Sequence, residues 1–86
     1  MKNLIFECSI DICKKPVMVK IFHEKADEFI NENYSFELSH YFKASDDIDI
    51  YIPSCHAESL EHCIYILNQY KNRFNDIEKE ETNKLF

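Results

Sequence analysis

The chain has 86 residues, enough for one small domain, and carries a net charge of −6 from 16 acidic and 10 basic side chains. A negative surface repels phosphate backbones, which argues against direct binding of nucleic acid. The sequence contains no glycine. A phosphate-binding loop, a dinucleotide-binding fingerprint and a nucleophile elbow need glycine in their usual form, so composition excludes these sites and predicts no cofactor.

Alternation of apolar and polar residues predicts four short strands, at residues 4–12, 17–21, 36–42 and 48–52. Period-two alternation is typical of strands that bury one face. A helix is predicted between the second and third strands, over about 23–33. Its apolar residues recur at helical spacing and its acidic residues face away from them.

A second and longer helix is predicted after Pro53, with Ser54 as its N-cap and an end near Glu81. Its apolar positions are spaced three and four residues apart: Leu60, Cys63, Leu67, Tyr70, Phe74 and Ile77. Such a helix is longer than the roughly four turns that cover a four-stranded sheet. Its distal residues would then fold back on the domain, contact a partner or pair with a second copy, and the residues after them, 78–86, would fray.

These elements predict an α+β fold of order ββαββα. A four-stranded antiparallel sheet would carry both helices on one face, the second being the long C-terminal helix. The chain is predicted to be one domain, 1–86, and its layout suggests a repeated ββα unit over 1–34 and 35–77.

Metal-binding side chains cluster only around the start of the second helix, at Cys55, His56, His62 and Cys63. Adjacent helical residues point about 100° apart, and residues seven apart are separated by about 10 Å along the axis. These four residues alone therefore do not form a tetrahedral zinc site. A small Cys/His metal-binding protein is the lesser alternative, and no metal ligand or catalytic residue is assigned.

The four cysteines have no paired spacing, and the N-terminal apolar run is too short for a signal peptide. No apolar stretch approaches the roughly 20 residues that span a bilayer. The sequence therefore predicts a cytoplasmic protein with reduced thiols that does not enter a membrane.

The polar faces of the predicted strands and of the first helix form an acidic surface with two tyrosines. Its predicted partner-binding residues are Glu7, Asp11, Glu24, Asp27, Glu28, Glu37, Tyr41, Asp49 and Tyr51. Spaced carboxylates can imitate phosphates in a basic groove, and tyrosines can act as rigid anchors. This pattern predicts a non-enzymatic module that binds a protein partner with a basic groove. An ordinary solvated sheet face has the same pattern and is the alternative interpretation.

In size, acidity and Lys/Asn/Ile-rich composition the chain resembles the small inhibitors that phages make against host CRISPR or restriction systems. The resemblance lies in composition over the whole chain and in no motif, so it transfers no site residue. It implies an inhibitor that mimics nucleic acid and blocks a host nucleic-acid-handling enzyme. The alternative is a homodimeric structural or regulatory protein, with Tyr70, Phe74 and Ile77 forming the dimer interface.

Overall fold

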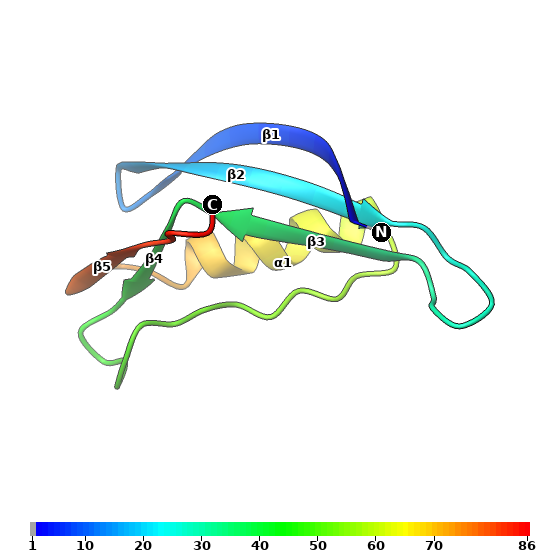
Figure 1. The fold of residues 1–86 in the computed structure, drawn as a ribbon. Coiled ribbons are helices and arrows are strands. Elements are labelled where there is room, and N and C mark those ends of the chain that lie inside the picture. The colour runs from blue at the N-terminus through cyan, green and yellow to red at the C-terminus, as the bar shows by residue number, and fades with distance from the viewer. Residues whose placement is uncertain (1) are drawn as a thin grey trace.

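Two antiparallel sheets and one helix make up the part of the chain that the computed structural model describes, residues 2–86 (Figure 1). The elements in chain order are β1 (Lys2–Ile12), β2 (Lys15–Glu24), β3 (Asn33–Leu38), β4 (His40–Lys43), α1 (Leu60–Asn72) and β5 (Lys79–Thr82). The larger sheet has the strand order β1-β2-β3, and β4 pairs with β5 in the smaller one. The molecule is mostly β and elongated, 43 × 22 × 21 Å in extent.

The first two strands form a hairpin, as the alternation predicts. Cys13 and Lys14 make its two-residue turn, and their φ angles of 49° and 66° lie in the left-handed region. Turns with positive φ at both positions match the twist of the flanking strands and usually contain asparagine or glycine. In this glycine-free chain the left-handed conformation costs about 1–2 kcal/mol per residue.

A β-bulge in β1 divides its side chains between the two faces of the larger sheet. Leu4 pairs with Phe22 and Phe6 pairs with Ile21, so Ile5 is the extra residue. Leu4 therefore lies on the outer face, which is the face away from α1, whereas Phe6 stays in phase with the inner face. Both side chains are exposed, although the alternation predicts them in the core.

The core lies between the inner face of the larger sheet, α1 and the smaller sheet. Its buried members are Ile12, Val17, Val19, Ile21, Phe36, Leu38, Phe42, Ala44, Cys55, Ala57, Cys63, Leu67, Tyr70 and Phe74. The buried residues of α1 recur at spacings of four and three, which keeps them on one side of the helix. This part of the helical periodicity is as the sequence predicts.

The predicted ββαββα fold, with a four-stranded sheet, two helices on one face and a long C-terminal helix, is wrong. In place of the first helix, β2 continues to Glu24 and residues 25–32 form a loop. The Asp27 carboxylate accepts hydrogen bonds from the backbone N–H groups of Phe29 (2.7 Å) and Ile30 (2.8 Å). Such bonds offer the backbone an alternative to helix, and isolated helices this short are marginal. The described part of the 1–34 unit therefore has no helix.

The predicted strand over 36–42 is interrupted at Ser39, where the chain passes from the larger sheet to the smaller one. The Ser39 hydroxyl accepts the backbone N–H of Met18 (2.9 Å), and the Ser39 N–H donates to the Met18 carbonyl (2.9 Å). These bonds end the pairing with β2, so that β4 finds its partner in β5.

The predicted strand over 48–52 is also absent. Only Tyr51 makes a β-bridge, to Phe42. The preceding segment is rich in aspartate, which favours turns, and the Asp47 carboxylate accepts the backbone N–H of Ala44 (3.0 Å). The chain therefore forms a hydrogen-bonded turn at residues 44–47, directly before the predicted strand, and does not continue as a strand.

Helix α1 begins later than predicted. Ser59, not Ser54, is its N-cap, and the Ser59 hydroxyl accepts the backbone N–H of His62 (3.1 Å). The segment before it is held in extended form because Ala57 exchanges two backbone hydrogen bonds with Tyr34, at 2.7 and 3.1 Å. Tertiary pairing therefore prevents an earlier start.

The same helix ends at Asn72, not near Glu81. Just beyond it, the Phe74 ring packs edge-to-face on Tyr70, with 5.0 Å between ring centroids. Residues expected to fray form β5 (Lys79–Thr82), which pairs with β4. The chain thus folds back after α1, and the apolar residues Phe74 and Ile77 pack against its own core.

Candidate protein-binding surface

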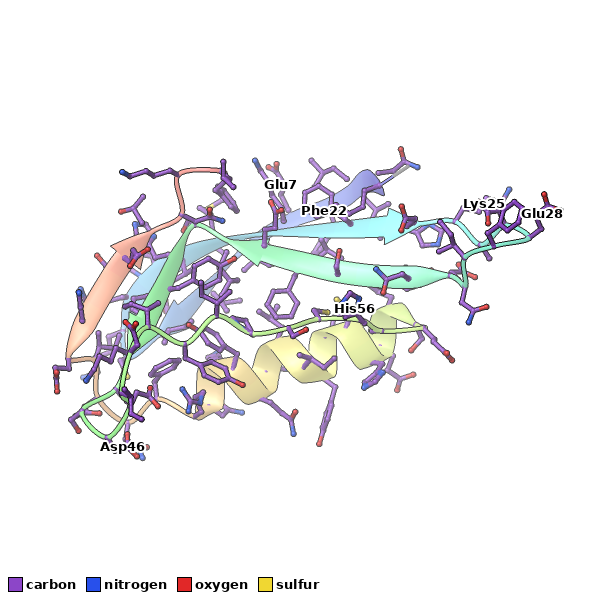
Figure 2. The ribbon with its side chains drawn as sticks, turned by 60° about the horizontal axis from the view of Figure 1, so that its bottom comes forward. Glu7, Phe22, Lys25, Glu28, Asp46 and His56 are labelled. Carbon is purple, nitrogen blue, oxygen red and sulfur yellow. The ribbon has the colours of Figure 1, made fainter. Side chains whose placement is uncertain are left out.

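The nine residues predicted to bind a partner lie in four separate parts of the molecule. Glu7, Asp11, Glu24 and Glu37 lie on the outer face of the larger sheet, Asp27 and Glu28 in the loop 25–32, Tyr41 on β4, and Asp49 and Tyr51 in the segment after β4. Figure 2 shows Glu7 and Phe22 on the outer face, Glu28 at one tip and Asp46 at the opposite end. The structure therefore does not bring all nine together on one face.

The outer face of the larger sheet carries charges of both signs. Glu7, Lys20 and Glu37 are cross-strand neighbours on β1, β2 and β3. Lys2 pairs with Glu37 at 3.9 Å and also lies over the Phe22 ring, 4.9 Å from its centroid. Lysines thus lower the negative charge at the centre of this face.

The C-terminal residues lie across part of the same face (Figure 1). The Asn83 side chain donates to the Leu38 carbonyl (2.9 Å), and its backbone N–H donates to the Ser39 carbonyl (2.8 Å). The Lys20 ammonium group donates to the Phe86 carbonyl and lies 4.2 Å from the centroid of its ring. The sequence carries no signal for this contact, because it depends on where β5 pairs.

The loop 25–32, which we call the acidic loop, projects beyond the ends of β2 and β3 (Figures 1 and 2). Its base is held by the His23 ring, which stacks on Tyr34 with 4.5 Å between centroids. The Glu32 carboxylate lies 2.7 Å from His23 Nε2 and accepts the Tyr34 hydroxyl at 3.4 Å. Burial and the nearby Glu32 charge raise the pKa of Tyr34. The loop is therefore fixed where it leaves the sheet.

The opposite end of the molecule is organised around Arg73. Its guanidinium donates to both Asp47 carboxylate oxygens at 3.1 Å and lies 4.0 Å from the centroid of the Tyr51 ring. The hydrogen bonds from Arg73 lower the pKa of Asp47. Tyr51 also stacks on Tyr70, with 5.8 Å between centroids. A shallow groove of about 340 Å³ beside them is lined by Tyr51, Pro53, Ser54, Ile66, Gln69, Tyr70 and Arg73.

Tyr41 is the remaining predicted anchor. It borders a hollow of about 600 Å³ beside the smaller sheet, lined also by Ile52 and residues 80–84. Tyr41 is half-buried, and burial raises the pKa of its hydroxyl. Both predicted anchor tyrosines are therefore partly engaged within the fold.

The predicted dimer residues lie against the core. Tyr70 and Phe74 are buried and Ile77 is half-buried. The Tyr70 hydroxyl accepts the Phe42 N–H (3.1 Å) and donates to the Tyr51 carbonyl (2.8 Å). Tyr70 and Phe74 are therefore part of the core of the monomer, whereas Ile77 keeps part of its surface exposed.

Of the cysteine and histidine cluster, only the two thiols meet. Cys55 Sγ and Cys63 Sγ lie 3.6 Å apart and both are buried, whereas His56 and His62 are exposed. Burial raises the pKa of Cys55 and raises that of Cys63 to about 12. Within residues 2–86, no three His, Cys, Asp or Glu side chains are placed to hold a metal ion together.

Several carboxylates make no ion pair with any residue between 2 and 86. They include Glu7 and Asp11 on β1, Asp27 and Glu28 in the acidic loop, and Asp49. Glu7 has Lys20 as its cross-strand neighbour, but exposed carboxylates that form no ion pair extend a negative field into the solvent around the protein. The net negative charge is thus displayed along the length of the molecule.

Comparisons with protein-family models, with curated proteins and with solved structures find no match. In the part of the chain that the structure describes, no helix has the length and apolar character needed to cross a membrane.

Proposed function

We propose that the chain is a non-enzymatic, acidic protein-binding module that occupies a basic groove of a protein partner. One observation supports this proposal most directly: carboxylates without ion pairs in residues 2–86 are distributed along a molecule 43 Å long and 22 Å wide. Negative charges spread along an elongated molecule resemble, in their long-range field, the phosphate backbone that a basic groove accepts.

The partner class in this proposal is a nucleic-acid-handling enzyme, such as a CRISPR-associated or restriction nuclease, which the module would block as a phage-type inhibitor. The resemblance in size and composition to such inhibitors supports this choice. A cytoplasmic location, where four free cysteines stay reduced, is part of the proposal.

Electrostatic attraction of this kind depends on salt. The Debye length is about 8 Å at physiological ionic strength and about 3 Å at 1 M. Complementary charge mainly raises the association rate and selects the partner. Binding that rests on these carboxylates should therefore weaken steeply as salt is added.

The test is affinity capture from a host lysate at low and high salt, followed by binding and cleavage assays with the purified captured enzyme. A double variant, Glu7→Lys with Asp11→Lys, reverses two carboxylates of β1 that have no ion pair in residues 2–86. The control, Asp46→Lys with Glu81→Lys, makes the same change in net charge at exposed sites away from β1 and from the start of α1. We expect the β1 variant to lose at least about tenfold in affinity and in inhibition, and the control to lose much less.

Equal losses in the two variants would mean that only net charge matters, which contradicts a specific groove contact. Capture of no nucleic-acid-handling enzyme, or capture that salt does not weaken, would also refute the proposal.

A further inference from the structure

Apolar side chains gather at one end of the molecule, which we call the loop end. It comprises the start of β1, the acidic loop, and the start of α1. The register of the larger sheet aligns Lys2 with Glu24 and Glu24 with Asn33. The bridge between Tyr34 and Ala57 brings the beginning of α1 to the same end. Figure 1 shows the start of β1, the tip of β2 and the first turn of α1 together there.

Phe29, in the acidic loop, is the most exposed large side chain at this end, at 88%. Further apolar side chains there are 40–50% exposed: Leu4, Ile5, Phe6, Ile30 and Leu60. The bulge at Ile5 contributes to this, because it places Leu4 on the outer face and leaves Phe6 at the sheet edge. Clustered exposed apolar residues mark interaction sites more often than isolated ones do.

The acidic loop holds Phe29 in a defined position. Asp27 accepts two backbone hydrogen bonds, from Phe29 and Ile30, and its own N–H donates to the Ile30 carbonyl at 2.9 Å. The stacked His23 ring fixes the base of the loop. An ordered loop loses less conformational entropy on binding, and buried aromatic residues are frequent hot spots.

We propose that the loop end docks into the partner, with Phe29 entering an apolar pocket whose rim carries lysine or arginine. This inference rests on the proposed function and names the contact that it uses. The pocket must be apolar because Phe29 offers no polar atom. Its rim must be basic because Asp27 and Glu28, which directly precede Phe29, have no ion pair within residues 2–86.

The charge of the acidic loop also argues against a second copy of this chain as the molecule that binds the loop end. The acidic loop has three acidic side chains, Asp27, Glu28 and Glu32, and one basic one, Lys25. Two copies meeting at the loop end would bring like charges together, which is costly at an interface. A partner with basic residues around an apolar pocket meets both requirements.

The test compares Phe29→Ala with Ile48→Ala. Ile48 is a matched control because it is also fully exposed in an aspartate-rich turn, at the other end of the molecule. The first probe is a short amphipathic peptide of leucine and lysine, and its binding is detected by NMR of the backbone amides of the protein. The same peptide with glutamate in place of lysine is the negative probe. We expect shift changes at residues 27–30 and 4–6. Phe29→Ala should weaken binding at least about tenfold and Ile48→Ala by less than about twofold.

Equal effects of the two substitutions, shift changes confined to the Ile48 end, or equal binding of the glutamate peptide would overturn the inference. So would dimerisation that Phe29→Ala abolishes, because the occupant would then be a second copy.

The captured enzyme separates this inference from the proposed function. Phe29→Ala should lower the part of the affinity that persists at high salt, whereas the β1 charge reversal should lower the part that salt removes. Loss with the charge reversal but none with Phe29→Ala would keep the proposed function and refute docking by the loop end. Failure of the whole chain to bind any basic nucleic-acid-handling enzyme would refute the proposed function itself.

Discussion

The Tyr70 hydroxyl joins three parts of the fold, and its removal by Tyr70→Phe tests how they are held together. It accepts the Phe42 N–H at 3.1 Å and donates to the Tyr51 carbonyl at 2.8 Å, and Tyr70 itself is 2% exposed. Burial raises its pKa to about 12, so it stays protonated and able to donate up to high pH. The substitution leaves the ring in place and removes only this link between α1, β4 and the segment after β4.

The expected cost comes mainly from the Phe42 N–H. Phe42 is fully buried, and a buried backbone donor left without a partner costs about 1–3 kcal/mol. The Tyr51 carbonyl adds less, because Tyr51 is exposed and water can replace the lost donor. We expect Tyr70→Phe to lower the free energy of unfolding by about 2 kcal/mol. For a domain of this size that corresponds to a fall of roughly 10 °C in Tm.

Urea unfolding followed by circular dichroism, together with thermal unfolding, measures this change. Tyr65→Phe is the control: Tyr65 is exposed, and its hydroxyl accepts only the Gln69 side chain. Its free energy of unfolding should change by less than about 0.5 kcal/mol. A Tyr70→Phe variant as stable as the wild type would show that the Tyr70 hydroxyl does not satisfy the Phe42 N–H in solution, and the reasoning would fail.

Two further predictions concern the titrating groups. Cys13 is exposed, whereas Cys55 and Cys63 are buried with raised pKa values, that of Cys63 about 12. A short pulse of iodoacetamide on the native protein should therefore label Cys13 first, as peptide mass spectrometry would show, and early labelling of Cys63 would contradict its burial. The pKa of Asp47 is lowered by the hydrogen bonds from Arg73, so this pair stabilises the fold above the ordinary aspartate pKa of about 3.9 and the stabilisation is lost as pH falls through the lowered value. Unfolding midpoints measured from neutral to acidic pH should show Asp47→Asn less stable than the wild type near neutrality and equal to it in acid; a constant difference at all pH values would exclude the charge as the cause.

The candidate surface was predictable in its chemistry but not in its layout. Acidity, and the surplus of carboxylates over basic residues, follow directly from the composition. Whether Glu37 has a cation beside it depends on the fold, because Lys2 reaches it across the sheet. The exposure of Phe29 was hidden for another reason. Phe29 and Ile30 follow Ala26 at spacings of three and four, which is typical of a buried helical face, yet the side-chain hydrogen bonds of Asp27 place Phe29 in a loop.

Local patterns in the sequence by themselves determined the N-terminal hairpin, the buried positions of α1 and the acidic character of the surface. These features depend on period-two or helical spacing and on charge, which act between near neighbours or by simple summation. Only the tertiary structure decided the rest. The bulge at Ile5, the passage between sheets at Ser39 and the end of α1 at Asn72 depend on partners far along the chain. A buried backbone N–H or C=O group must have a hydrogen-bond partner, and the complete fold decides which group that partner is. Local propensity does not specify this partner.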